Sequence, residues 1–197
     1  EKEDLLEDTI VLFQSDHGHS VEERTFGGGG SAGPYRGHKG TLFEGGIKVP
    51  SVISWPKGIP QGQVRAQFVT ATDWFPTFAE WTGSTLPKGH QLDGKSLAQV
   101  VEDSRTRSPH ENYYWELGRK NPQWAVRQAD WKLYARAKES VRPNGVTELS
   151  DADRKRFLVN LAEDPGETRN WAKEHPKELE RLEKLAVEYQ NGLARSL

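Results

Sequence analysis

A chain of 197 residues is long enough for one compact domain, or for one large and one small domain, and it can bury a sizeable core. Charged residues make up 28% of it, with 27 basic against 29 acidic, so no strong field of either sign attracts nucleic acid or an anionic membrane. No window approaches the roughly 18 consecutive apolar residues of a membrane span. Cysteine is absent, which excludes disulfides, thiolate metal sites and cysteine nucleophiles within these residues.

The first predicted element is a strand at residues 9–13, Thr-Ile-Val-Leu-Phe. This continuous apolar run is typical of a parallel strand that is buried on both faces. Polar residues follow it directly, at the edge where open α/β sheets place their ligands, and this makes Asp16 and His17 candidates for a binding site. The next stretch, residues 27–34, begins with four glycines and predicts a mobile surface loop.

Strands and helices alternate over the following part of the chain. An apolar run at residues 49–55, interrupted by a proline, predicts a short strand at a sheet edge. Thr72 or Asp73 can cap a helix that has Pro76 in its first turn and ends at Gly83.

From residue 112 onward the sequence changes to short aromatic strands. Three are predicted, at residues 112–117, 124–127 and 131–136, with a turn at residues 128–130, and together they form an antiparallel meander. A helix starts at Pro176, and its apolar stripe indicates that it lies on a core. The stripe consists of Leu179, Leu182, Leu185, Ala186, Tyr189 and Leu193.

The densest polar constellation joins residues 15–18, Ser-Asp-His-Gly, to residues 36–41, Arg-Gly-His-Lys-Gly-Thr. The Asp and the His can give a divalent ion one oxygen and one nitrogen ligand, although two ligands are too few without others, and an ordinary Asp turn is the alternative. Lys39 has glycine beside it, so its ammonium and nearby backbone can approach a tetrahedral anion together; the alternative is a solvated surface lysine. His19 and His38 are weaker candidates for proton transfer at neutral pH.

Two segments resemble the paired signature of the type I sulfatases, the arylsulfatase branch of the alkaline phosphatase superfamily. They are residues 15–18 and residues 35–50, Tyr-Arg-Gly-His-Lys-Gly-Thr-Leu-Phe-Glu-Gly-Gly-Ile-Lys-Val-Pro. The resemblance continues in order along nearly the whole chain and covers only the C-terminal part of the family. The further segments that match are residues 73–77, 92–97, 124–127, 130–133 and 164–167.

The resemblance implies an α/β fold class, the C-terminal part of an alkaline-phosphatase-like sandwich plus a small antiparallel sheet with a C-terminal helix. On this basis residues 1–110 complete the large α/β domain, and residues 111–197 form the small C-terminal subdomain.

Roles for individual residues follow from the same resemblance. Asp16 resembles the family's metal-binding aspartate, His17 takes the neighbouring ligand place, and Lys39 resembles the lysine that contacts the sulfate group. The implied cofactor is a divalent metal, usually calcium, but because calcium prefers oxygen ligands, His17 leaves magnesium or another ion open. The family's nucleophile is a formylglycine made from Cys or Ser in a Cys/Ser-x-Pro/Ala-x-Arg motif, accompanied by an Asp-Asp metal pair. We expect no serine of this chain to have this motif, and we expect both the motif and the Asp-Asp pair in the missing N-terminal part.

The function implied is a sulfatase, a sulfuric ester hydrolase, to which this chain supplies part of the metal and sulfate site while being inactive alone. The chain does not begin with methionine; we expect a mature piece or an internal fragment whose partner is the N-terminal portion of the same sulfatase, as precursor or companion chain. The expected substrate is a sulfate ester, with no nucleic acid and no membrane span. The family also implies export, to the periplasm, the extracellular space or the lysosome.

Two alternatives stay open. One is a phosphate or phosphonate monoester hydrolase of the same superfamily, because a metal and a lysine stabilise either tetrahedral anion. The other is a non-catalytic binding fragment.

Overall fold

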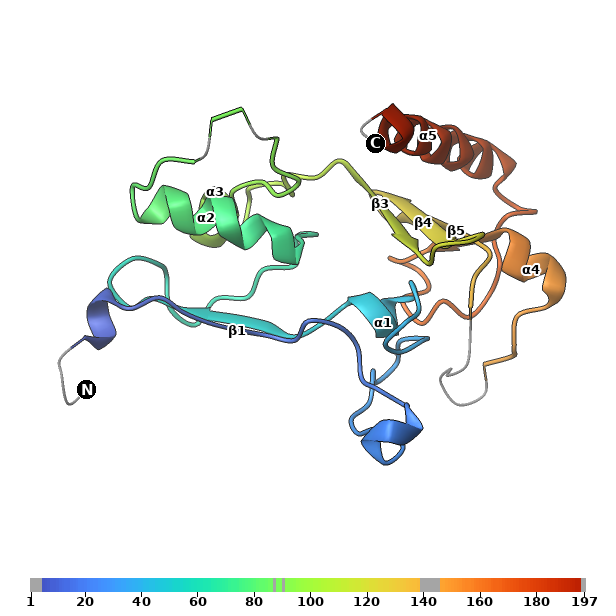
Figure 1. Cartoon of the computed structure of the whole chain (residues 1–197), viewed down its shortest axis with the longest axis horizontal. Coiled ribbons are helices and arrows are strands. Elements are labelled where there is room, and N and C mark those ends of the chain that lie inside the picture. The colour runs from blue at the N-terminus through green and yellow to red at the C-terminus, as the bar shows by residue number, and fades with distance from the viewer. Residues whose placement is uncertain (1–4, 87, 90, 139–145, 196–197) are drawn as a thin grey trace. The chain divides into compact units, whose positions relative to one another are not determined.

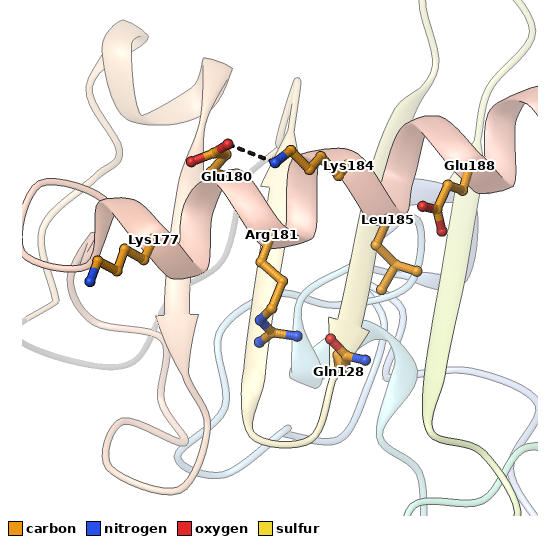
Figure 2. Close-up of a pocket in the computed structure, with 7 residues that line it drawn as sticks. All are labelled: Gln128, Lys177, Glu180, Arg181, Lys184, Leu185 and Glu188. Atoms are coloured by element: carbon orange, nitrogen blue, oxygen red, sulfur yellow. Dashed lines mark ion pairs between the residues drawn. The ribbon is translucent and has the colours of Figure 1, made fainter.

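A computed structural model describes residues 5–86, 88–89, 91–138 and 146–195 (Figure 1). By its internal contacts the chain divides into two compact units, Glu1–Asp16 with Pro50–Glu111 and His17–Val49 with Asn112–Leu197. The second unit includes residues 17–49, which the sequence predicts to lie in the large domain at residues 1–110. That predicted domain boundary stays a prediction.

The first unit contains a two-stranded antiparallel sheet. β1 (Val11–Gln14) pairs with β2 (Ser51–Ser54). The predicted strand is therefore present, but its prediction as a parallel strand buried on both faces is wrong for this structure. Val11 is 50% exposed and Phe13 is 72% exposed. The physical reason is that β1 has a single strand neighbour among the described residues, so no second layer buries its outward side chains.

A 3-10 turn, η3 (Ala71–Asp73), leads into the predicted helix α2 (Trp74–Trp81). The Asp73 carboxylate accepts the backbone N–H of Thr70 at 2.7 Å, which ties the start of the turn to its end. Gly83 follows the helix with a left-handed φ of +65°, as expected of a helix stop. The other helical elements of this unit are η1 (Leu6–Asp8) and α3 (Ala98–Glu102).

The second unit contains a four-stranded antiparallel sheet in the order β3-β4-β5-β6. Its strands are β3 (Asn112–Leu117), β4 (Gln123–Gln128), β5 (Trp131–Ala135) and β6 (Phe157–Asn160). The first three confirm the predicted meander, and in the turn between β4 and β5 Ala129 takes a left-handed φ of +52°. The sequence does not predict β6.

Both faces of this sheet are covered, so alternate residues of each strand enter two different cores. The first core contains Phe43, Ala125, Tyr134, Phe157 and Val159, and lies next to the short helix α1 (Glu44–Ile47). The second contains Trp124, Val126, Leu133, Leu158, Leu182 and Ala186. The last two belong to α5 (Pro176–Arg195), the predicted amphipathic helix, which runs along the sheet in Figure 1. None of the helices in the described part of the chain is long and apolar enough to cross a membrane.

The glycine-rich loop follows the 3-10 turn η2 (Glu23–Thr25). The loop lies on the surface, as predicted, but one of its residues is held by backbone pairing. Ser20 pairs with Gly29 in an antiparallel bridge, and a Cβ on Gly28 would lie 1.5 Å from the Ser20 carbonyl oxygen. Position 28 therefore requires glycine for close backbone approach.

A further helix, α4 (Asp151–Lys155), forms in a charged segment for which the sequence predicts no element. Ser150 is its N-cap: the Ser150 hydroxyl accepts the Asp153 N–H at 3.1 Å and donates to the Asp153 carboxylate at 2.6 Å. Arg154 and Lys155 in the last turn complement the helix dipole.

Packing of α5 can be tested at Leu182, which is 0% exposed. Replacing Leu182 with alanine leaves a cavity, and we expect the free energy of unfolding to fall by about 2–5 kcal/mol. Leu193→Ala is the matched control, because Leu193 is on the same helix but 49% exposed; its expected loss is within about 0.5 kcal/mol. Urea unfolding followed by circular dichroism measures both. Equal losses would contradict the described packing.

The N-cap of α4 gives a second prediction. Ser150→Ala removes the acceptor for the Asp153 N–H, so the expected loss is about 1 kcal/mol of unfolding free energy. Ser150→Asn keeps an acceptor and should lose only a small part of this. Thermal unfolding of the two variants decides the matter, and an alanine variant as stable as the parent would rule out the cap.

Candidate functional site

The two sequence motifs meet through glycines. The Gly18 N–H donates to the Gly46 carbonyl at 2.9 Å, and a Cβ on Gly18 would lie 1.9 Å from the Gly45 carbonyl oxygen. A Cβ on Gly45 would in turn lie 2.5 Å from the carbonyl oxygens of Arg36 and Gly37. No larger side chain fits at Gly18 or Gly45 without displacing backbone. The contact packs the end of the first motif against the short helix of the second.

Asp16 and His17 follow β1 directly, as the sequence predicts. The His17 Nδ1 lies 2.8 Å from the carbonyl oxygen of Gly18. Because a carbonyl can only accept, Nδ1 carries the ring proton, and in the neutral ring Nε2 is the nitrogen with the lone pair that binds a metal. Metal-binding histidines are commonly held by such a bond from their other ring nitrogen.

The donors in the described part of the chain do not complete a metal site. Across the described residues, no group of three or more His, Cys, Asp or Glu side chains is arranged to hold an ion. Asp16 and His17 are adjacent in the sequence and offer one oxygen and one nitrogen, whereas calcium takes 6–8 oxygen ligands. Their chemistry fits a divalent ion only together with further ligands from outside these residues.

Lys39 stands on a tight turn within the second motif. The Thr41 N–H and hydroxyl both donate to the His38 carbonyl, at 3.0 and 2.9 Å, and the Lys39 N–H donates to the His19 carbonyl at 3.0 Å. The Lys39 ammonium contacts the Glu22 carboxylate at 3.0 Å, with the two side chains 30% and 40% exposed. The backbone of Lys39 is thus held in place, while its ammonium stays accessible to solvent.

Glu22 is a neighbour of Lys39 that the sequence does not predict. The carboxylate oxygen that contacts Lys39 also accepts the Arg24 guanidinium at 2.9 and 3.0 Å. Hydrogen bonds from Lys39 and then from Arg24 lower the pKa of Glu22, so its carboxylate is charged at neutral pH. In the sequence Glu22 resembles any other surface acid. Its contact with Lys39 could have been predicted only by knowing that the chain reverses here, with Ser20 paired to Gly29.

His19 and His38 come together beside this turn, with ring centroids 6.3 Å apart. Burial lowers the pKa of His38, and the charge of His19 lowers it further. His38 is therefore neutral at pH 7 and adds no positive charge next to Lys39. Both histidines stay weaker candidates for proton transfer.

His110, to which the sequence assigns no role, is a buried histidine of the first unit. Its Nε2 lies 2.8 and 3.0 Å from the two carboxylate oxygens of Asp73, and one of these oxygens also accepts the Lys95 N–H at 2.9 Å. Ser108 is nearby, but its hydroxyl donates to the Phe68 carbonyl at 2.5 Å. A serine nucleophile would donate to the imidazole instead, so the geometry is that of a structural cluster.

One serine has the spacing of the formylglycine motif, which corrects the expectation that none does. Residues 150–154, Ser-Asp-Ala-Asp-Arg, fit Ser-x-Ala-x-Arg. The structure accounts for this serine as the N-cap of α4, because its hydroxyl makes both of its hydrogen bonds to Asp153. The Asp-Asp pair does not occur in the sequence. We therefore keep the nucleophile as an expectation for another portion of the protein.

Comparisons with known proteins agree with the resemblance. The family profile described as Sulfatase matches residues 1–84. The chain is 39% identical to steryl-sulfatase of Homo sapiens over 139 residues, which cover 66% of this chain and 24% of that protein. It is 33% identical to a sulfatase of Formosa agariphila over 188 residues, which cover 88% of this chain and 30% of that protein. The chain thus spans between about a quarter and a third of the length of these relatives.

The fold agrees as well. The crystal structure of PsFucS1 sulfatase from Pseudoalteromonas sp. matches with a TM-score of 0.75 and 24% identity, covering 96% of this chain and 38% of that one. The match confirms the predicted fold class, part of an alkaline-phosphatase-like α/β fold with an antiparallel sheet and a C-terminal helix. These similarities of sequence support a fragment of a sulfatase-family protein.

Proposed function

We propose that, in the full-length protein, this chain supplies part of the active site of a sulfuric ester hydrolase. The observation that carries the proposal is the contact of Gly18 with Gly45 and Gly46, because it joins the motif that contains His17 to the segment that presents Lys39. The second of these motifs, residues 35–50, is the most specific part of the family resemblance.

Lys39 is the residue that we propose to bind an oxygen of the sulfate group. Its ammonium is a compact charge with three donors, which suits a tetrahedral anion. The substrate oxygen would take the place that the Glu22 carboxylate now occupies at 3.0 Å. Charge grows on the oxygens around the breaking bond, so a fixed cation there stabilises the transition state more than the ground state.

Asp16 and His17 are proposed as two of the ligands of a divalent ion, which the family resemblance suggests is calcium. When bound, such an ion supplies positive charge that polarises a coordinated oxygen. Asp16 would contribute a negatively charged oxygen and His17 its Nε2, with the ring oriented by the bond from Nδ1 to the Gly18 carbonyl. The other ligands and the nucleophile are proposed to come from the N-terminal portion of the same protein.

The exposed apolar face of β1 and β2 supports such a partner portion. Phe13 and Val52 are opposite each other in the sheet and are 72% and 63% exposed, and Val11 on the same face is 50% exposed. Large apolar side chains that lie together on a sheet face mark a surface that another element covers. We propose that the N-terminal portion packs on this face.

Substitution of Lys39 tests the sulfate-binding role in the full-length protein. We expect Lys39→Ala to lower kcat for a chromogenic aryl sulfate by on the order of a hundredfold or more, as for the loss of one oxyanion-type donor. Lys39→Arg should restore only part of it, because a planar guanidinium does not reproduce a compact ammonium. Lys48→Ala, a change in the same motif, is the control and should keep near-normal kcat.

Near-normal kcat in a folded Lys39→Ala variant would remove the lysine from the site. Hydrolysis of an aryl phosphate in clear preference to the aryl sulfate would instead favour the phosphate or phosphonate monoester hydrolase.

The metal ligands can be tested separately from turnover. In the full-length protein, Asp16→Ala should lose bound metal, whereas His17→Asn should keep much of it, because the asparagine side chain offers an oxygen of similar reach. Elemental analysis of the purified variants measures metal content directly. Full occupancy in Asp16→Ala would mean that the ion is held elsewhere.

A further inference from the structure

Lys132 on β5 is a fully buried cation, with 0% exposure. Its ammonium donates to the Leu42 carbonyl at 2.9 Å and to the Glu44 carboxylate at 2.7 Å. It also lies over the rings of Trp115 and Tyr134, 5.1 and 4.9 Å from their centroids. Removing an ammonium from water is costly unless it is paired and hydrogen-bonded, so Lys132 ties the positions of Leu42 and Glu44 to the sheet.

Glu167 holds the same segment from a second direction. One of its carboxylate oxygens accepts the Glu44 backbone N–H at 2.8 Å, and the other accepts the Tyr134 hydroxyl. Glu167 is itself 0% exposed, and its N–H donates to the Asp164 carbonyl at 3.1 Å. Glu44 is thus held by Lys132 at its side chain and by Glu167 at its backbone.

The short segment between α1 and Lys39 transmits this restraint. The Gly45 N–H donates to the Arg36 carbonyl at 2.7 Å, which fixes the start of the Lys39 turn to α1. Gln123 on β4, only 2% exposed, donates to the Gly40 carbonyl at 2.9 Å. The turn that carries Lys39 is therefore anchored to two neighbouring strands of the sheet.

We propose that Lys132, Glu44 and Glu167 form a buried latch that positions Lys39 for the sulfate group, an inference that rests on the proposed function. Lys132 acts as a positioning residue, since its contacts are with the segment that carries Lys39. An apolar side chain of the same size could fill the space, but it would lack the hydrogen bonds that define where Leu42 and Glu44 lie.

The charges of the latch make it sensitive to pH. Burial is the largest single effect on the Glu44 pKa and raises it, but the charge and the hydrogen bond of Lys132, together with the charges of Arg127 and Lys48, lower this pKa on balance. Burial dominates at Glu167 and raises its pKa to about 7. The charge of Glu44 raises this pKa further, whereas the charge of Lys132 and the hydrogen bond from Tyr134 lower it. Because this pKa lies above the ordinary 4.5, the contribution of Glu167 to stability is complete below that value and is lost as pH rises through about 7.

A double-mutant cycle in the full-length protein tests whether Lys132 acts through Lys39. We expect Lys132→Met to lower kcat for an aryl sulfate by on the order of tenfold to a hundredfold, as for a small misplacement of a binding group. In a Lys39→Ala background the same change should have little further effect, because the residue it positions is gone. Lys155→Met, an exposed change on α4, should leave kcat unchanged. An equal fold-loss in both backgrounds would overturn the proposal.

Hydrogen exchange over residues 36–47 tests the latch without turnover. Lys132→Met should lose protection there, and protection in the parent protein, corrected for intrinsic exchange, should fall between about pH 5 and 7. Glu167→Gln keeps the size of the side chain but cannot ionise, so its protection should not change over this range. If Lys132→Met fails to fold, the comparison of Glu167→Gln with the parent protein is the test. Protection in Glu167→Gln that depends on pH as strongly as in the parent would overturn the latch. A parent protein that hydrolyses no sulfate ester overturns the proposed function instead.

Discussion

The buried ammonium of Lys132 is the constraint on which the arrangement of the second unit depends. Its two hydrogen bonds connect the middle of the antiparallel sheet to the segment at residues 42–44. A buried ion pair adds little net stability over apolar packing, because the cost of desolvation offsets the attraction. Its contribution is directional: apolar surfaces can slide past each other, whereas hydrogen bonds of 2.7 and 2.9 Å fix one relative position. The segment at residues 36–47, which contains four glycines, therefore takes part of its geometry from these hydrogen bonds to the sheet.

The elements that could be predicted from the sequence are those with a clear period. The strands β3 to β5 and the helix α5 follow from alternation and from the apolar stripe. The role of Lys132 could not be predicted, because a lysine between Trp131 and Leu133 normally faces solvent on a one-sided sheet. Here α5 covers one face and the segment around Phe43 covers the other, so the lysine faces a core. Its partner Glu44 is 88 residues away in the sequence, beyond the reach of any local pattern.

The first strand illustrates a different limit. The apolar run at residues 9–13 indicates correctly that a strand forms, but hydrophobicity shows only that a face is suited to burial, not what buries it. The structure pairs β1 antiparallel with β2 and leaves Phe13 exposed. In the candidate site, the motifs identify Asp16, His17 and Lys39 by resemblance. The Glu22 contact and the packing of Gly18 on Gly45 depend on chain reversal and close backbone approach, which residue types alone do not specify.

Lys39 combines two restraints of very different strength. Its backbone belongs to a turn held by buried partners, including Thr41 at 5% exposure and Gln123 at 2%. Its ammonium pairs with Glu22 near the surface, and exposed pairs of this kind contribute at most about 1 kcal/mol. Under the proposed function, an incoming sulfate oxygen would replace Glu22 at little cost, while the turn itself would not have to reorganise. A developing negative charge is stabilised best by a cation that is already held in position and only weakly paired. Folding has then fixed the position of the cation, so the protein does not have to rearrange during the reaction.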